Sequence, residues 1–314
     1  MNAHKTSTPS TLAAPTVLGV PECIWPAGAN LGEGTLWSVR EQALYWLDIL
    51  TPRLFWFRPR DGVRRAWQFD EEITAISERA TAPGLILTLR RGFALFDTTP
   101  FPGVGASPHY LHRPEPERTG NRFNDGKCDS RGRFWAGSMD FDCKAPTGAL
   151  YRYDADGSCT RHDDGFEVTN GPTWSGDGRT MYVNNTATNT LYAYDFDMDA
   201  GTVANRRVWH RLPRGDGLPD GMTTDAAGRV WIAHWDGACV TCHDPVSAAE
   251  LCRIALPAGN VTDCAFGGAD MQTLYISTAR NGRTQEQLKN EPLAGGLFAV
   301  RIGSPGVAAP LFAG

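Results

Sequence analysis

Short runs of alternating hydrophobic and polar residues follow one another along this chain, and Gly, Asp and Pro separate the runs. Alternation with a period of two predicts β-strands, because successive side chains of a strand point to opposite faces. The separating residues tolerate the backbone dihedrals that tight turns require. Helical spacing of apolar residues is nearly absent, and residues 282–290 are expected to form one short helix. The pattern therefore predicts an all-β protein.

One turn-and-strand unit recurs along the sequence. Its copies occupy residues 41–46, 82–87, 129–135, 175–182, 225–231 and 270–275. In the three clearest copies the turn glycines Gly132, Gly178 and Gly228 are 46 and 50 residues apart, and every copy is followed by a second alternating strand. Six units at this spacing predict a six-bladed β-propeller, in which four-stranded blades surround a central tunnel. A β-sandwich or a jelly roll is the alternative, but neither explains a unit that recurs along the whole chain.

No linker interrupts the repeats, so residues 21–314 are expected to form a single propeller domain. The first 16 residues are mainly Ser, Thr, Pro and Ala and lack the apolar core of a signal peptide. We therefore expect residues 1–20 to form a disordered N-terminal tail and the protein to be cytoplasmic. The longest apolar stretch, residues 85–89, is much shorter than the roughly 20 residues of a membrane span, so no membrane partner is expected.

The charge and the cysteines exclude further classes of protein. The chain has 30 Lys and Arg against 35 Asp and Glu, a net charge of −5, and no block of like charge that would bind nucleic acid. Its 8 cysteines are scattered over 314 residues, which is typical of free thiols rather than of a disulfide scaffold. We expect a monomer or a weak homo-oligomer.

Several catalytic motifs are missing from the sequence. It contains no GxSxG nucleophile elbow, no HExxH zinc helix, no GxGxxG and no phosphate-binding GxxxxGK. The CxxCH at residues 239–243 falls on a predicted strand, so we interpret its cysteines as core residues rather than as a haem attachment site. Residues 195–199 begin like an EF-hand loop, but Ala200 stands where that loop requires Gly, which favours a solvated turn.

Four polar residues precede the turn-and-strand units at equivalent positions. Glu33, Asn124, Asn170 and Asp220 follow one another at intervals of 91, 46 and 50 residues, which correspond to two blades, one blade and one blade. Equivalent positions of successive blades face the same end of the central tunnel, so these side chains are expected to converge there. Taken singly, each could instead be an Asx-turn or capping residue at a strand end.

Two carboxylates and two amide oxygens at one tunnel mouth would form a cage of oxygen donors. Such hard ligands suit Ca²⁺, Mg²⁺ or Mn²⁺, and the lack of Cys or several His makes a structural zinc site a poor interpretation. The sequence therefore predicts one divalent metal ion, with Ca²⁺ as the first choice and Zn²⁺, Mn²⁺, Mg²⁺ or Fe²⁺ as alternatives.

The same stretches carry a resemblance to a known family. The motifs LGEGTLW from Leu31, RFNDGKCDSRGRFWAGSM from Arg122, TNGPTWSGDGRTMY from Thr169 and LPDGMTTDAAGRVW from Leu218 resemble those of the SMP-30/gluconolactonase/regucalcin-like family. The stretches at residues 260–262, 278–280 and 292–296 are similar to the bacterial sugar-lactonase branch of this family. The resemblance implies a six-bladed propeller with one divalent metal in the tunnel.

The resemblance also implies roles for individual residues. Glu33, Asn170 and Asp220 would bind the metal, and Arg122 and Asn124 would contact a sugar lactone. Asp142 stands where the family often has an acidic residue that touches the substrate, but it is shorter than the more usual Glu.

A lactone is an internal ester, and a divalent cation can activate both its carbonyl and the attacking water, which removes the need for a Ser or Cys nucleophile. We assign Asp220 as general base and metal ligand, with Glu33 as the competing assignment. The expected substrate is a small aldono-1,4- or 1,5-lactone, such as glucono-, xylono- or arabinonolactone. The alternatives are a metal-dependent phosphotriesterase or arylesterase, and a non-catalytic calcium-binding propeller.

Overall fold

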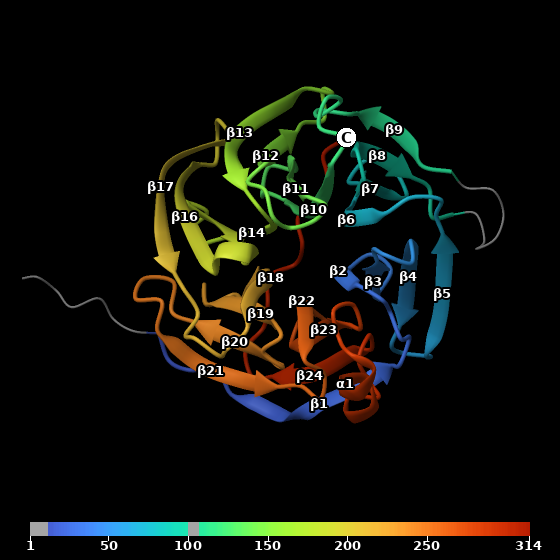
Figure 1. Cartoon of the computed structure of the whole chain (residues 1–314), viewed down its shortest axis with the longest axis vertical. Coiled ribbons are helices and arrows are strands. Elements are labelled where there is room, and N and C mark those ends of the chain that lie inside the picture. Colours follow the sequence, from blue (N-terminus) through green and yellow to red (C-terminus); the bar gives the residue numbers. More distant parts are fainter. Residues whose placement is uncertain (1–11, 100–106) are drawn as a thin grey trace, which may run out of the picture.

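The structure is a computed structural model, and it describes residues 12–99 and 107–314. In these residues six four-stranded antiparallel sheets stand around a common centre, like the blades of a propeller (Figure 1). The prediction of a six-bladed β-propeller is therefore confirmed.

Each of the first five blades consists of four consecutive strands, in the order in which they leave the tunnel. Blade 1 contains β2 (Gly32–Ser38), β3 (Ala43–Asp48), β4 (Arg53–Arg58) and β5 (Val63–Gln68). Blade 2 contains β6 (Ile73–Glu78), β7 (Leu85–Leu89), β8 (Gly92–Phe96) and β9 (His109–His112). Blade 3 contains β10 (Asn121–Cys128), β11 (Phe134–Asp140), β12 (Gly148–Tyr153) and β13 (Cys159–Phe166). Blade 4 contains β14 (Thr169–Trp174), β15 (Thr180–Asn185), β16 (Thr190–Asp197) and β17 (Thr202–His210), and blade 5 contains β18 (Leu218–Thr224), β19 (Val230–Trp235), β20 (Cys239–His243) and β21 (Glu250–Ala255).

The sixth blade joins the two ends of the chain. It contains β22 (Asn260–Gly267), β23 (Thr273–Ala279) and β24 (Leu297–Ile302), and its outermost strand is the N-terminal β1 (Val17–Trp25), which pairs antiparallel with β24. Residues 17–20, which we expected in the N-terminal tail, therefore belong to the strand that closes the ring. Residues 1–11 of that expected tail lie outside the described residues.

The first strand of every blade lines the tunnel. The innermost strands β2, β6, β10, β14, β18 and β22 contact one another in ring order. Buried apolar clusters join neighbouring blades; one of them packs Phe93 of blade 2 against Phe123 and Phe134 of blade 3. At the junction of blades 1 and 6, Trp37 stacks on Tyr275 with ring centroids 5.5 Å apart. The core is thus distributed between the blades, which leaves the central tunnel free for polar side chains.

The C-terminal segment crosses the end of the tunnel opposite the starts of the innermost strands. Gly306 forms a bridge with Asp225 of blade 5, and Phe312 forms one with Arg79 of blade 2. Residues 307–310 line a cavity of about 370 Å³ at this end of the tunnel. In Figure 1 this segment is the red trace that runs across the centre of the ring.

The expected helix is present as α1 (Gln285–Asn290), three residues shorter at its start than the predicted range. Thr284 begins it with a capping box: its side chain accepts from the backbone N–H of Gln287, whose side chain accepts from the backbone N–H of Thr284. The CxxCH motif forms the buried strand β20, as expected of core residues. In the described residues no helix is long and apolar enough to cross a membrane.

Candidate active site

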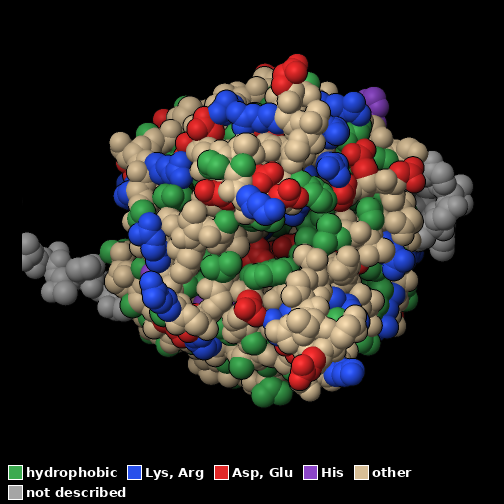
Figure 2. All heavy atoms as spheres, in the orientation of Figure 1, with side chains coloured by type: hydrophobic (Ala, Val, Ile, Leu, Met, Phe, Trp, Pro, Cys, Tyr) green, Lys and Arg blue, Asp and Glu red, His purple; other side chains and the backbone are tan. Residues whose placement is uncertain are grey.

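The starts of the innermost strands surround one mouth of the tunnel. Figure 2 shows the ring hollowed at its centre, with acidic side chains at the bottom of the hollow. Glu33, Arg122, Asn124, Asn170 and Asp220 all belong to innermost strands, and each is less than one-tenth exposed. The tunnel mouth therefore gathers buried polar side chains from four blades.

Each of the four strands that carry these residues has a β-bulge. The pairing register shifts between Glu33 and Leu36, between Phe123 and Gly126, between Asn170 and Thr173, and between Pro219 and Met222. A bulge redirects the side chains beside it and is common next to active sites. The four residues expected to converge lie at these bulges, so the repeat of the backbone explains why they share one end of the tunnel.

Glycines make two of the bulges possible. Gly34, directly after Glu33, has φ +59°, and Gly171, directly after Asn170, has φ +78°. Such angles favour glycine because a side chain would clash with the backbone. A Cβ atom would also lie 2.8 Å from the side chain of Leu47 at position 34 and 2.8 Å from that of Met222 at position 171. The Glu-Gly and Asn-Gly pairs of the sequence motifs are thus explained by local geometry.

A chain of hydrogen bonds connects three of the predicted site residues. Arg122 Nη1 donates to Asn124 Oδ1 at 2.6 Å, and Asn124 Nδ2 donates to Asn170 Oδ1 at 2.9 Å. Asn170 Nδ2 donates to Thr186 Oγ1 at 2.8 Å, and that hydroxyl donates to the carbonyl of Pro219, the residue before Asp220, at 2.7 Å. The network fixes the orientation of both amide groups and ties blade 3 to blades 4 and 5.

Burial and nearby negative charge act on both carboxylates of the predicted cage. Burial raises the pKa of Glu33 well above its usual range, and the negative charges of Asp220, Asp263 and Asp125 raise it further. Burial likewise raises the pKa of Asp220, with added repulsion from Asp125 and Asp263 that Arg122 partly offsets. Two carboxylates buried beside other negative charges would be stabilised by a bound cation.

The donors at the mouth fit a hard divalent cation. Glu33, Asn170 and Asp220 offer only oxygen, the ligand type that Ca²⁺, Mg²⁺ and Mn²⁺ prefer. Asn184 Oδ1 is buried without a hydrogen-bond partner, although its amide group donates to the backbone carbonyl of Asp220 at 2.6 Å. Over the described ranges no group of three or more His, Cys, Asp and Glu side chains could hold a metal by itself.

Asp142 stands apart from these residues. It is exposed in the turn after β11, whereas Arg122 is buried. Its neighbour Cys143 lies close enough to Arg122 for the guanidinium charge to act on the thiol. The turn therefore borders the tunnel mouth, and the substrate contact of Asp142 stays a prediction.

Four polar residues inside the ring were not predicted from the sequence. Asp125, Lys127, Asn184 and Asp263 are placed by their strands next to the predicted set, and the side chains of Asp125, Asn184 and Asp263 are fully buried or nearly so. Asp125 and Lys127 stand within the motif around Asn124, and Asp263 occupies the bulge of β22, so blade register could have indicated them. Nothing in the sequence marks Asn184, which lies opposite Asn170 on the next strand of blade 4.

Comparison with known proteins identifies the family. The model of the SMP-30/gluconolactonase/LRE-like region matches residues 31–280. The chain belongs to this family. Among its curated members, the chain is 38% identical over 294 residues to the 6-deoxy-6-sulfogluconolactonase of Pseudomonas putida, covering 93% of this chain and 98% of the relative. It is 31% identical over 303 residues to human regucalcin, again covering 93% and 98%. Among solved structures, a luciferin-regenerating enzyme has a TM-score of 0.86 and 27% identity, covering 95% of this chain and 99% of that one.

Proposed function

We propose that this protein is a metal-dependent lactonase that opens the ring of a sugar lactone to give the aldonic acid. The observation that carries the proposal is the set of buried oxygen donors at the tunnel mouth, with the Arg122 guanidinium held beside it by Asn124 at 2.6 Å. The family supports a lactonase, since a curated relative of 38% identity is named as a lactonase of a gluconolactone derivative.

Glu33, Asn170 and Asp220 would hold the metal ion. When bound, a divalent cation supplies Lewis-acid polarisation of the lactone carbonyl and neutralises negative charge that develops there. We keep Ca²⁺ as the first choice among the metals that an oxygen cage accepts.

Asp220 would act as general base toward the attacking water. Burial and neighbouring carboxylates raise its pKa, which brings its affinity for protons closer to that required near neutral pH. Water adds to the carbonyl carbon as Asp220 takes its proton, and the tetrahedral oxyanion then collapses with cleavage of the ring C–O bond. The ring oxygen leaves as a hydroxyl group of the product and takes the proton that Asp220 removed from the water. Glu33 remains the competing base, because its carboxylate is also buried among the polar side chains at the tunnel mouth.

Arg122 and Asn124 would orient the sugar. Arg122 Nη1 is already engaged by Asn124 and by the carbonyl of Phe123 at 2.9 Å, which fixes the plane of the guanidinium. The other guanidinium N–H groups suit the hydroxyls and carbonyl oxygen of a lactone, and their charge favours the developing oxyanion. Asp142 would contact the outer part of the sugar from the exposed turn.

The test is a pH-indicator assay of lactone opening with a panel of pentono- and hexonolactones. The panel includes glucono-, xylono- and arabinonolactone and the sulfonated gluconolactone named for the Pseudomonas relative. Each substrate is measured with untreated protein, after chelation, and after Ca²⁺, Zn²⁺, Mn²⁺, Mg²⁺ or Fe²⁺ is restored. We expect turnover that chelation abolishes and one or more metals restore.

Two outcomes would contradict the proposal. Turnover of organophosphates or aryl esters with no activity on lactones would identify a phosphotriesterase or arylesterase. Metal-dependent thermal stability with no turnover of any ester would indicate a non-catalytic metal-binding propeller.

A further inference from the structure

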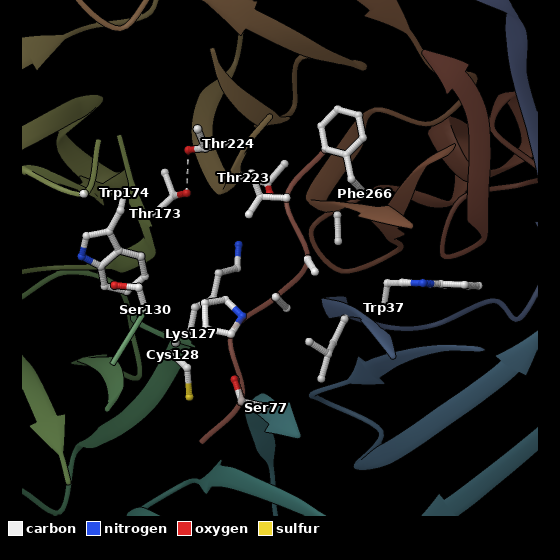
Figure 3. A pocket seen from close by; sticks show the side chains of 18 of the residues that line it. Trp37, Ser77, Lys127, Cys128, Ser130, Thr173, Trp174, Thr223, Thr224 and Phe266 are labelled. Atoms are coloured by element: carbon white, nitrogen blue, oxygen red, sulfur yellow. Dashed lines mark hydrogen bonds between the residues drawn. The ribbon is translucent and has the colours of Figure 1, made fainter. Parts of the chain in front are cut away.

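Three charged residues lie further along the tunnel than the predicted metal ligands. We call them the supporting triad: Asp125 and Lys127 on β10, and Asp263 on β22. Asp125 and Lys127 line the cavity at the far end of the tunnel, and Figure 3 shows the Lys127 amine extending into the tunnel. Lys127 Nζ lies 3.6 Å from Asp263 Oδ1, and the Asp263 side chain is fully buried.

Each member of the supporting triad bonds to a strand that carries one expected metal ligand. Asp263 Oδ2 accepts from both the backbone N–H and the hydroxyl of Thr35 at 2.8 Å, two residues after Glu33. Asp125 Oδ2 accepts from the backbone N–H of Gly171 at 2.9 Å, directly after Asn170. Lys127 Nζ donates to the backbone carbonyl of Met222, two residues after Asp220. Each member of the supporting triad therefore contacts a different one of the three strands that carry Glu33, Asn170 and Asp220.

Two of these contacts, those of Asp263 and Asp125, compensate for the bulges. The backbone N–H groups of Thr35 and Gly171 fall inside the register shifts of β2 and β14, where regular ladder pairing is interrupted. A buried N–H without a partner is costly, so the carboxylates of Asp263 and Asp125 stabilise the bulged conformation that directs Glu33 and Asn170 to the tunnel mouth.

Asp263 also fits closely against the strand of Asp220. A Cβ atom at Gly221 would lie 2.3 Å from Asp263 Oδ1, so glycine at 221 is what leaves room for the carboxylate.

Burial alone would lower the pKa of Lys127, but the charges of Asp263 and Asp125 outweigh that effect and raise it. The positive form of the lysine is therefore favoured inside the ring, with the Asp263 carboxylate 3.6 Å from its amine.

From these contacts we infer that Asp125, Lys127 and Asp263 are positioning residues for the divalent-metal site, each fixing one of the strands that carry Glu33, Asn170 and Asp220. The inference rests on the proposed metal site and adds the residues that set its geometry. Outer partners of metal ligands typically contribute about 10- to 100-fold in metal affinity.

The substitution Lys127→Met separates positioning from simple electrostatics. Removal of a positive charge near the cage would strengthen cation binding if charge alone mattered. Loss of the bond to Met222 would weaken it if Lys127 positions the Asp220 strand. The two explanations thus predict opposite signs for the change in metal affinity.

Arg133→Met is the matched control. Arg133 also pairs with a buried carboxylate, Asp129, at 2.7 Å, and donates to a backbone carbonyl, that of Met198, at 2.7 Å. Its contacts lie in the turns of blades 3 and 4 rather than in the tunnel. The control therefore removes the same kinds of interaction without touching the ligand strands.

The experiment measures binding of Ca²⁺ and of Mn²⁺ to the metal-free full-length proteins by isothermal titration calorimetry, together with the melting temperature of each protein. We expect Lys127→Met to lower metal affinity about 10- to 100-fold. Arg133→Met is expected to lower the melting temperature and to bind metal as the wild type does. Affinity of Lys127→Met equal to or higher than that of the wild type would overturn the inference.

A second pair of variants covers the case in which Lys127→Met does not fold. Asp263→Ala removes both bonds to Thr35, whereas Asp263→Asn removes the charge but keeps an acceptor for them. Positioning predicts that Asp263→Asn recovers most of the affinity lost in Asp263→Ala. Equal losses in the two variants would contradict it. A flat titration of the wild type would instead refute the proposed metal-dependent function itself.

Discussion

Asn124 is the residue whose removal tests the proposed substrate contacts most sharply. It accepts from Arg122 Nη1 at 2.6 Å and donates to Asn170 Oδ1 at 2.9 Å and to the carbonyl of Thr169 at 2.7 Å. Asn124→Ala therefore removes one of the two acceptors that hold Arg122 Nη1, the other being the carbonyl of Phe123, and it removes the donor to Asn170 Oδ1.

The size of the effect follows from the bond to Arg122. A hydrogen bond to a charged group contributes about 1.5–3 kcal/mol, which corresponds to a loss of about 10- to 160-fold in kcat/KM if the bond is needed to orient Arg122 in the transition state. Because both residues would act through one guanidinium, the double variant with Arg122→Ala should be little worse than Arg122→Ala alone.

Steady-state lactone hydrolysis with the restored metal measures this loss, and Asn121→Ala serves as control. Asn121 is a buried asparagine on the same strand, with its amide bonded to Glu115 at 2.9 Å rather than to the predicted site residues. It should affect stability and leave kcat/KM close to that of the wild type. Wild-type kcat/KM in Asn124→Ala, or fully additive losses in the double variant, would refute the assignment of Arg122 and Asn124.

Three further predictions concern the base, the C-terminal segment and pH. Asp220→Asn should abolish lactone turnover even at saturating metal, and unimpaired hydrolysis would remove Asp220 from the mechanism in favour of Glu33. Phe312 is 2% exposed and packs on Tyr153 with ring centroids 6.2 Å apart. Phe312→Ala should therefore lower the free energy of unfolding, measured in urea, by about 3–5 kcal/mol. A loss below about 1 kcal/mol, roughly the value for a surface position, would show that Phe312 does not anchor the C-terminal segment. Burial lowers the pKa of His162 and His243 to about 4, against about 6.5 in an unfolded chain. Between about pH 6.5 and about pH 4 these two imidazoles are therefore protonated in the unfolded chain but not in the folded protein. Stability should therefore fall as the pH is lowered from about 6.5 towards 4, and unfolding curves of His243→Gln should show a shallower decline than those of the wild type.

Most of the fold could be predicted because turn residues recur at a regular spacing along the sequence. Gly132, Gly178 and Gly228 mark equivalent turns, and their spacing fixes the number of blades. The closing strand was harder to predict, because residues 17–20 are mostly exposed on the outermost strand and carry no alternating pattern. Their place depends on pairing with β24 at the other end of the chain, which no local pattern encodes.

Some residues of the candidate site could likewise be predicted from the sequence, and others could not. Glu33, Asn124, Asn170 and Asp220 could be found because equivalent positions in the blades face one tunnel mouth. Blade register could have indicated Asp125, Lys127 and Asp263 as well, but not their role, because that role depends on which backbone groups of the ligand strands their side chains reach. Asn184 matters through a cross-strand neighbour, Asn170, and its unpartnered oxygen becomes visible only when the side chains are packed.

The most direct test of the central claim is an anomalous diffraction map from a crystal soaked in Mn²⁺. We predict one strong peak at the tunnel mouth, at coordination distance from side-chain oxygens of Glu33, Asn170 and Asp220. A fully occupied Mn²⁺ site elsewhere, or these three side chains too far apart to share one ion, would contradict the proposed metal site.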